Sequence, residues 1–182
     1  VSTDTLYVIV VLLIVKLNNT TITYSVSVET ETNPLIDTCT ITLIAGWNLV
    51  SLNVDPTNPA TTTVFPSATI VKTADLFHDI SVPTKFITLT QIKGGTGYLV
   101  YNTKNETLQI IGMRTQPFTT LFKSGWNLYG CPWTEKKSLE NAMGDELEYI
   151  KTIRTFGKTW QKGGNSNNLN SIEPSKGYYI LK

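Results

Sequence analysis

Ile-Ala-Gly-Trp-Asn-Leu-Val-Ser, at residues 44–51, recurs as Lys-Ser-Gly-Trp-Asn-Leu-Tyr-Gly at residues 123–130. A second pair of similar stretches follows: Gly-Thr-Gly-Tyr-Leu-Val at residues 95–100 and Ser-Lys-Gly-Tyr-Tyr-Ile at residues 175–180. The two tryptophans lie 79 residues apart, and the glycines that precede the tyrosines lie 80 residues apart. Because two separate landmarks keep nearly the same offset, we interpret the chain as two tandem copies of one unit.

The repeat divides the chain into three parts. Residues 1–38 form an N-terminal strand or anchor segment with a linker, residues 39–113 the first β repeat module, and residues 118–182 the second. A unit of about 70 residues lies near the lower limit for an independent hydrophobic core. We therefore expect the two modules to pack on each other.

The composition favours an all-β, mainly antiparallel fold. Threonine, isoleucine, valine and tyrosine are abundant, and such residues fit pleated, half-buried surfaces. We predict two sandwich-like modules with at most one short helical turn, at residues 138–144, between an N-capping Ser138 and a terminating Gly144. Charged residues make up 16% of the chain and the net charge is +1. This balance argues against a nucleic-acid partner, which needs a clustered basic face.

An uninterrupted apolar run lies near the start of the chain. Its members are Leu6, Tyr7, Val8, Ile9, Val10, Val11, Leu12, Leu13, Ile14 and Val15. A membrane-spanning helix needs about 20 such residues, so two interpretations stay open. The run is either a strand, buried or given to a neighbouring subunit, or a short membrane or signal-like anchor. Residues 20–32 alternate and predict a half-buried strand, and residues 33–38 read as a linker.

Within the modules, strands are predicted at residues 40–44, 70–73, 98–101 and 108–111, the last pair joined across the turn at residues 102–106. The strand at residues 149–153 matches that at residues 70–73 with an offset of 79. Residues 75–84 read as a polar loop.

The duplicated motif is interpreted as structural. Tryptophan buries a large apolar area, glycine permits a turn, and the asparagine amide bonds to backbone groups at the turn. The predicted structural core of the repeats comprises Gly46, Trp47, Asn48, Gly97, Tyr98, Gly125, Trp126, Asn127, Gly177 and Tyr178. The alternative is a row of exposed aromatic faces that stack on sugar rings. For such a glycan contact Trp133 and Trp160, with the loop at residues 163–170, are the better candidates.

Other reactive residues give weak signals. Cys39 and Cys131 are either two buried thiols or one disulfide. His78 stands beside acidic residues, but a single histidine favours an ordinary loop residue over a metal ligand. The acidic residues 145–148 could bind Ca²⁺, yet they read more simply as a solvated turn. We therefore predict no cofactor, and no catalytic set matches a known pattern, so the chain is not expected to be an enzyme.

The motif order resembles a known group of repeats. A hydrophobic strand, Gly-Trp-Asn-Leu, a short helical turn, a central tryptophan and a closing Gly-Tyr-aromatic are similar to tandem repeats in large secreted and cell-surface proteins of bacteria and archaea. Those repeats often end on Leu-Glu-Pro-Gly-Lys-Gly-Tyr, and residues 172–178 here read Ile-Glu-Pro-Ser-Lys-Gly-Tyr. The first repeat lacks the central tryptophan and has Lys-Gly-Gly-Thr at residues 93–96. The resemblance implies an extracellular β module, usually without enzymatic activity, and is compatible with a viral surface protein.

These observations predict a structural subunit of an extracellular surface assembly (a filament, sheath or coat) or of a viral shell. The expected partners are copies of the chain or other surface subunits, contacted through the apolar run, with a membrane as a second candidate partner for the N-terminus. The alternative function is adhesion or glycan binding.

Overall fold

The computed structural model of the chain describes residues 16–17, 20–21, 35–116 and 122–182, in two compact units, Val1–Pro34 and Leu35–Lys182. In the first unit, strand β1 (Lys16–Leu17) pairs antiparallel with β2 (Thr20–Thr21). The apolar run at residues 6–15, and the alternating pattern from residue 22 onward, lie outside the described residues.

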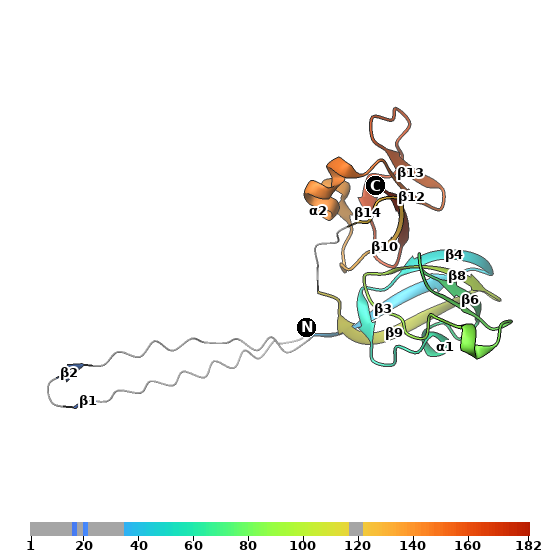
Figure 1. Cartoon of the computed structure of the whole chain (residues 1–182), viewed down its shortest axis with the longest axis horizontal. Coiled ribbons are helices and arrows are strands. Elements are labelled where there is room, and N and C mark those ends of the chain that lie inside the picture. Colours follow the sequence, from blue (N-terminus) through green and yellow to red (C-terminus); the bar gives the residue numbers. More distant parts are fainter. Residues whose placement is uncertain (1–15, 18–19, 22–34, 117–121) are drawn as a thin grey trace. The chain divides into compact units, whose positions relative to one another are not determined.

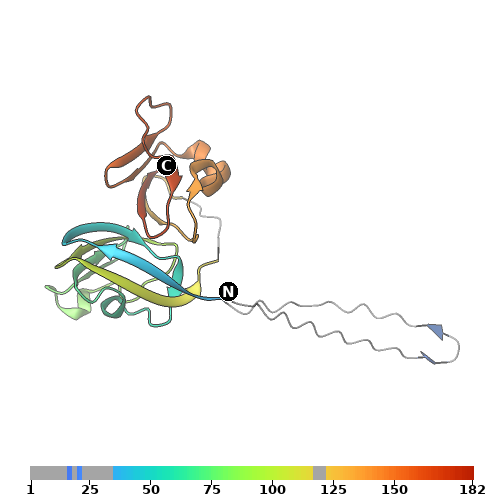
Figure 2. The same ribbon diagram turned by 180° about the vertical axis from the view of Figure 1, so that it is seen from behind.

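The first repeat is a sandwich of two antiparallel sheets, which Figures 1 and 2 show from opposite sides. One sheet has the strand order β4-β8-β6-β7 and the other the order β3-β9-β5. A single core of buried side chains from both sheets fills the space between them. The strands are β3 (Ile36–Leu43), β4 (Gly46–Ser51), β5 (Val54–Pro56), β6 (Ala68–Lys72), β7 (Phe77–Asp79), β8 (Gly97–Asn102) and β9 (Glu106–Arg114).

The second repeat, orange to red in Figure 1, rebuilds the first of these sheets. Its strand order β10-β15-β12-β13 matches β4-β8-β6-β7 strand for strand, so the duplication seen in the sequence is a duplication of topology. It has its own buried cluster, which lies within residues 122–180. The strands are β10 (Trp126–Gly130), β11 (Lys137–Ser138), β12 (Thr152–Thr155), β13 (Lys158–Gln161), β14 (Ser171–Ile172) and β15 (Gly177–Leu181).

The all-β class is thus confirmed, and helical structure is confined to short turns. The predicted turn is α2 (Leu139–Met143): the Ser138 hydroxyl accepts a hydrogen bond from the Asn141 amide at 3.3 Å, and Gly144 ends the helix at φ +53°. Three further turns were not predicted, namely α1 (Thr61–Val64), η1 (Thr84–Phe86) and η2 (Gly144–Tyr149).

The strand boundaries and pairings correct three sequence-based expectations. Strand β3 begins at Ile36, so residues 36–38 belong to the first repeat and not to a linker. Strand β9 pairs with β3 and β5 and not with β8, so the turn at residues 102–106 carries the chain from one sheet to the other. In the second repeat, the strand predicted at residues 149–153 begins only at Thr152, because η2 extends to Tyr149. The equivalence of the two strands is set by their pairing: Val71 stands opposite Val100, and Ile153 stands opposite Ile180.

The Gly-Trp-Asn turn is built in the same way in both repeats. Gly46 and Gly125 adopt φ +99° and +93°, which favours glycine. The Asn48 side chain accepts from the Ile44 amide at 2.9 Å and donates to the carbonyl oxygens of Ile44 and Gly46 at 2.8 and 3.0 Å. Asn127 makes the equivalent three bonds. The predicted roles of these glycines and asparagines are confirmed.

The predicted burial of the two motif tryptophans is wrong. Trp47 is 40% exposed and Trp126 is 51% exposed, whereas Tyr98 and Tyr178 are each 1% exposed. The reason is the period of two along a strand. The asparagine that follows each tryptophan turns its amide inward to bond the preceding turn, so the tryptophan points to the opposite, outer face. The tyrosines of the second motif fill the core, as predicted.

The two repeats meet through reciprocal contacts. The Ser51 amide donates to the Ser175 carbonyl at 3.2 Å, and its equivalent, the Gly130 amide, donates to the Gly95 carbonyl at 3.1 Å. Isolated bridges join Val50 to Lys176 and the equivalent Tyr129 to Thr96. These backbone contacts of one repeat on the other are returned, as in a two-fold symmetric dimer. The expectation that the modules pack on each other is confirmed.

The close contact between the repeats explains why glycine stands at the start of the Gly-Tyr motif in both repeats. A Cβ atom on Gly97 would lie 2.7 Å from the Tyr129 carbonyl oxygen, and one on Gly177 would lie 2.8 Å from the Val50 carbonyl oxygen. Gly130 faces Ser51 directly, since a Cβ there would lie 2.6 Å from that of Ser51. The Ser51 hydroxyl donates to the Lys176 carbonyl at 2.8 Å and accepts from the Cys131 amide at 3.0 Å. One hydroxyl of the first repeat thus bonds to two backbone groups of the second.

Candidate binding surfaces

The exposed tryptophans are each part of an aromatic pair on the outer face of a four-stranded sheet. Trp47 packs edge-on against Tyr101, with ring centroids 5.1 Å apart, and Trp126 packs edge-on against Tyr179 at 6.3 Å. The Arg154 guanidinium lies over the Trp126 ring at 5.8 Å from its centroid. Both pairs present aromatic surface to solvent.

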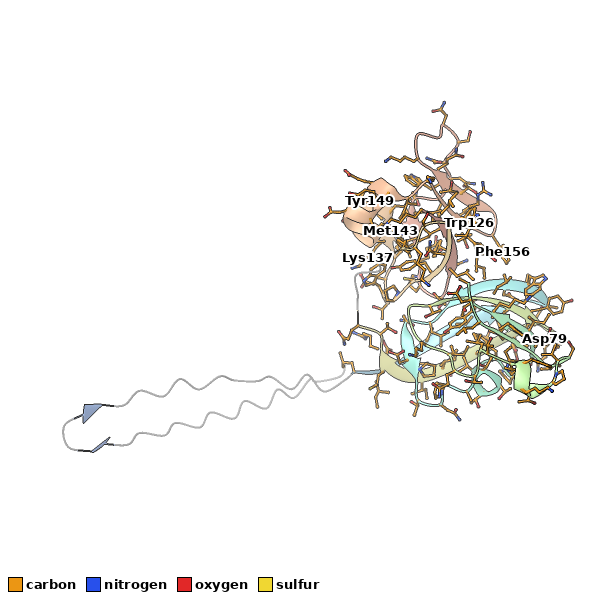
Figure 3. All side chains as sticks on the ribbon, viewed as in Figure 1. Asp79, Trp126, Lys137, Met143, Tyr149 and Phe156 are labelled. Carbon is orange, nitrogen blue, oxygen red and sulfur yellow. The ribbon has the colours of Figure 1, made fainter. Side chains whose placement is uncertain are left out.

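The tryptophans predicted for glycan contact lie elsewhere. Trp133 and Trp160 are half-buried and pack against the second core. The Trp133 ring carries the Lys137 ammonium at 4.6 Å, and its indole N–H is buried without a hydrogen-bond acceptor among the described residues. Figure 3 labels Lys137, which lies over the Trp133 ring, and Trp126 at separate places on the second repeat. These two tryptophans therefore contribute to packing more than Trp47 and Trp126 do.

The loop at residues 163–170 is tied to the edge of β13. The Asn167 side chain accepts from the Gln161 amide at 2.7 Å, and that of Asn168 accepts from the Thr159 amide at 2.7 Å. Leu169 is buried in the second core. These bonds cover backbone groups that an edge strand would otherwise leave unpaired.

His78 lies in strand β7 and not in a loop. It is 9% exposed and pairs with Val71, the place that Trp160 holds opposite Ile153 in the second repeat. The central tryptophan that the first repeat lacks is therefore replaced by this histidine. Its neighbour Asp79 accepts hydrogen bonds from the Ser81 hydroxyl and amide, which lower the pKa of the carboxyl group.

The two cysteines are free and buried, so the structure contains the thiols and not the disulfide. Burial raises the pKa of Cys131 to about 11 and also raises the pKa of Cys39. A thiol that stays protonated at neutral pH is a poor nucleophile.

The acidic residues at 145–148 lie in η2, where Glu146 pairs with the Lys182 ammonium at 2.8 Å. Within residues 35–116 and 122–182, histidine, cysteine and acidic side chains form no group of three that could hold a metal ion.

A second exposed apolar surface lies on the outer face of the β3-β9-β5 sheet. We call it the β3–β9 patch; it consists of Ile36, Ile111 and Met113, of which Ile36 is 74% exposed. Ile36 stands directly opposite Met113, and Ile111 follows on the same face. Sequence patterns do not predict this patch, because residues 36–38 read as a linker. An apolar cluster on a sheet face that is otherwise rich in threonine is a candidate contact surface.

The free edge of β3 beside this patch is already bonded. The Thr38 amide donates to the Asp37 carboxylate at 2.8 Å, and the Ser175 hydroxyl donates to the Thr40 carbonyl at 2.9 Å. The Arg114 guanidinium lies 2.8 Å from the Asp37 carboxylate and lowers the pKa of that group. These bonds oppose the addition of a further strand along the middle of the edge.

No helix in the described parts of the chain is long and apolar enough to cross a membrane. Compared with protein-family models, curated proteins and solved structures, the chain matches none.

Proposed function

We propose that the chain is a non-enzymatic structural subunit of an extracellular surface assembly or of a viral shell. The apolar run at residues 6–15 makes the contact between subunits, and its target is the β3–β9 patch of a neighbouring copy. The observation that supports this proposal most is the patch itself: Ile36, Ile111 and Met113 are exposed together on one sheet face.

The run and the patch suit each other chemically. The run has no charged residue between positions 6 and 15, and it needs cover because an exposed apolar strand aggregates. Burial of apolar area yields about 25 cal/mol per Å², so a contact of this kind is driven by the hydrophobic effect. Because the edge of β3 is already bonded, the run packs on the sheet face and does not extend the sheet.

Two variants test the proposal. Deletion of residues 1–17 is expected to leave the repeats folded, by circular dichroism, and to abolish particles or fibres in electron micrographs of the purified protein. The double variant Ile36→Thr with Ile111→Thr keeps strand-forming residues and is expected to have the same effect. Ile80→Thr is the matched control, because Ile80 is also exposed but lies outside the patch.

The outcomes separate the two parts of the proposal. Assembly that survives the deletion contradicts the role of the N-terminal run. Assembly that is lost on deletion but survives the double variant shows that the run binds a different surface.

Adhesion or glycan binding is the second candidate function. The residues that the sequence favours for it, Trp133 and Trp160, are half-buried against the core. What favours this function is the pair of exposed aromatic clusters elsewhere on the two repeats.

A further inference from the structure

We propose that the outer faces of the two four-stranded sheets bind a polysaccharide, and that the site on the second repeat recognises sugars that carry carboxylates. This inference does not depend on the assembly proposal, because it involves neither the N-terminal run nor the β3–β9 patch. It moves the glycan site from Trp133 and Trp160 to residues on the outer face.

The site on the second repeat comes from three adjacent strands. Trp126 lies on β10, Tyr179 on β15 and Arg154 on β12, and these strands are neighbours in the sheet. Tyr179 stands directly opposite Arg154 and diagonal to Trp126. We call Trp126, Tyr179 and Arg154 the second platform.

The first repeat carries the same three kinds of side chain on the equivalent strands. Trp47 lies on β4, Tyr101 on β8 and Lys72 on β6. The tyrosine differs in position: Tyr101 is directly opposite Trp47, whereas its equivalent opposite Trp126 is Leu181. Both repeats thus present a tryptophan, a tyrosine and a cation, although the tyrosine has moved by two residues. We call Trp47, Tyr101 and Lys72 the first platform.

Packing does not account for the exposed indoles. The cores of both repeats are filled by other residues, among them Tyr98 and Tyr178, and Trp47 and Trp126 belong to neither cluster. The Trp126 indole is flanked by an edge-on tyrosine and by the Arg154 guanidinium, and the Trp47 indole by an edge-on tyrosine. The exposed part of each indole is therefore available to a sugar ring. Aromatic side chains with a polar rim supply apolar contact together with hydrogen bonding.

The charges of the two platforms distinguish their ligands. Among the described residues no carboxylate lies within 4 Å of the Arg154 guanidinium. A guanidinium fork matches a carboxylate in two parallel hydrogen bonds. In the first platform the cation is an ammonium, a point charge without the planar fork, and no contact of Lys72 with an aromatic ring appears among the described residues. The second platform is therefore the one suited to an acidic sugar, and the first supplies mainly stacking.

The test is affinity electrophoresis of the full chain in native gels that contain one polymer each. The acidic probes are polygalacturonate, alginate and hyaluronan, and the neutral probes are methyl-esterified pectin and amylose. We expect at least one acidic polymer to retard the protein, and we expect methyl-esterified pectin and amylose to have little effect.

The variants identify the residues. Trp126→Ala and Arg154→Met are each expected to weaken binding about tenfold, Trp47→Ala less, and the double tryptophan variant is expected to abolish it, because two linked sites bind one polymer more tightly than either does alone. Phe86→Ala is the matched control: Phe86 is also exposed and carries the Lys85 ammonium over its ring at 5.1 Å. Circular dichroism verifies the fold of each variant.

Three results would overturn the inference. They are no retardation of the native protein by any acidic polymer, equal retardation by the esterified polymer, and a loss in Phe86→Ala as large as that in Trp126→Ala.

Discussion

Gly97 and Gly177 show how closely one residue can tie the sequence to the architecture. Both start a strand, and neither adopts a positive φ. Their requirement for glycine comes from the other repeat, whose carbonyl oxygen occupies the space of a side chain. The sequence marks these glycines as repeated but cannot give the reason, because the atoms that exclude a Cβ lie more than 30 residues away in one case and more than 120 in the other.

We predict that Gly97→Ala lowers the free energy of unfolding by about 1–3 kcal/mol, the usual cost of overpacking a tight contact. Gly164→Ala is the comparison, because a Cβ there would lie 3.1–3.2 Å from atoms of Gln161 and Asn167, which a shift of a few tenths of an ångström relieves, and φ is not positive. We expect a smaller loss there, within about 1 kcal/mol. Urea denaturation measures both. Equal effects of the two substitutions would show that the contact between repeats is not tight.

A second prediction concerns the asparagine of the turn. In Asn48→Asp the side chain can still accept from the Ile44 amide but can no longer donate to the two carbonyl oxygens. A buried carboxylate that faces carbonyl oxygens costs more than a lost neutral bond, so we expect a loss of about 2–3 kcal/mol, against about 1 kcal/mol for Asn53→Asp. Asn53 is equally buried as a residue, but its amide group makes no side-chain hydrogen bond among the described residues and is not among the fully buried polar atoms without a partner, so a carboxylate there reaches water. Thermal denaturation at neutral pH compares the two variants.

At the scale of the elements, local patterns predicted the strands, and non-local pairing did not follow from them. The helical turn α2 was predicted from its capping serine and terminal glycine, which are local signals. Strand β9 was given the wrong partner, because a short turn usually joins strands of one sheet, and here it joins two sheets. The period of two along a strand predicts that each tryptophan and the asparagine after it face opposite sides of the sheet. It does not predict which of the two faces inward. The hydrogen bonds of the Asn48 and Asn127 amides decide this, and only the structure shows them.

The N-cap of α2 gives a prediction at this scale. Ser138→Ala removes the acceptor for the Asn141 amide and is expected to cost about 1 kcal/mol. Ser138→Asp keeps an acceptor at the start of the helix and is expected to retain most of the stability. Chemical denaturation of both variants tests the pair, and equal losses would show that the cap does not stabilise the turn.

At the scale of the whole molecule, the repeats share one contact while each keeps its own core. Several groups that ionise at high pH lie inside these cores. Burial raises the pKa of Tyr98, Tyr129 and Tyr178, and it raises the pKa of Cys131 from 9.0 to about 11. In the unfolded chain these groups lose their protons more readily than in the folded one.

The free energy of unfolding is therefore expected to be independent of these groups below pH 9 and to fall above it. For Cys131 alone the loss amounts to roughly 2–3 kcal/mol between pH 9 and about 11, because each unit of pKa shift corresponds to about 1.4 kcal/mol. Urea denaturation across this range measures the slope, and Cys131→Ala should make it shallower. Constant stability up to pH 11 would contradict the burial of these groups.

The contact between Ser51 and Gly130 also limits which halves can associate. If two copies of the first repeat were joined in the same way, the Ser51 side chain of one copy would meet the Ser51 side chain of the other. The space between the repeats holds only one such side chain. Two copies of the second would bring two glycines together and leave the Cys131 amide without its hydroxyl partner. Divergence at a single pair of positions has thus made unlike halves the better match, which discourages exchange between like halves of neighbouring chains at high local concentration.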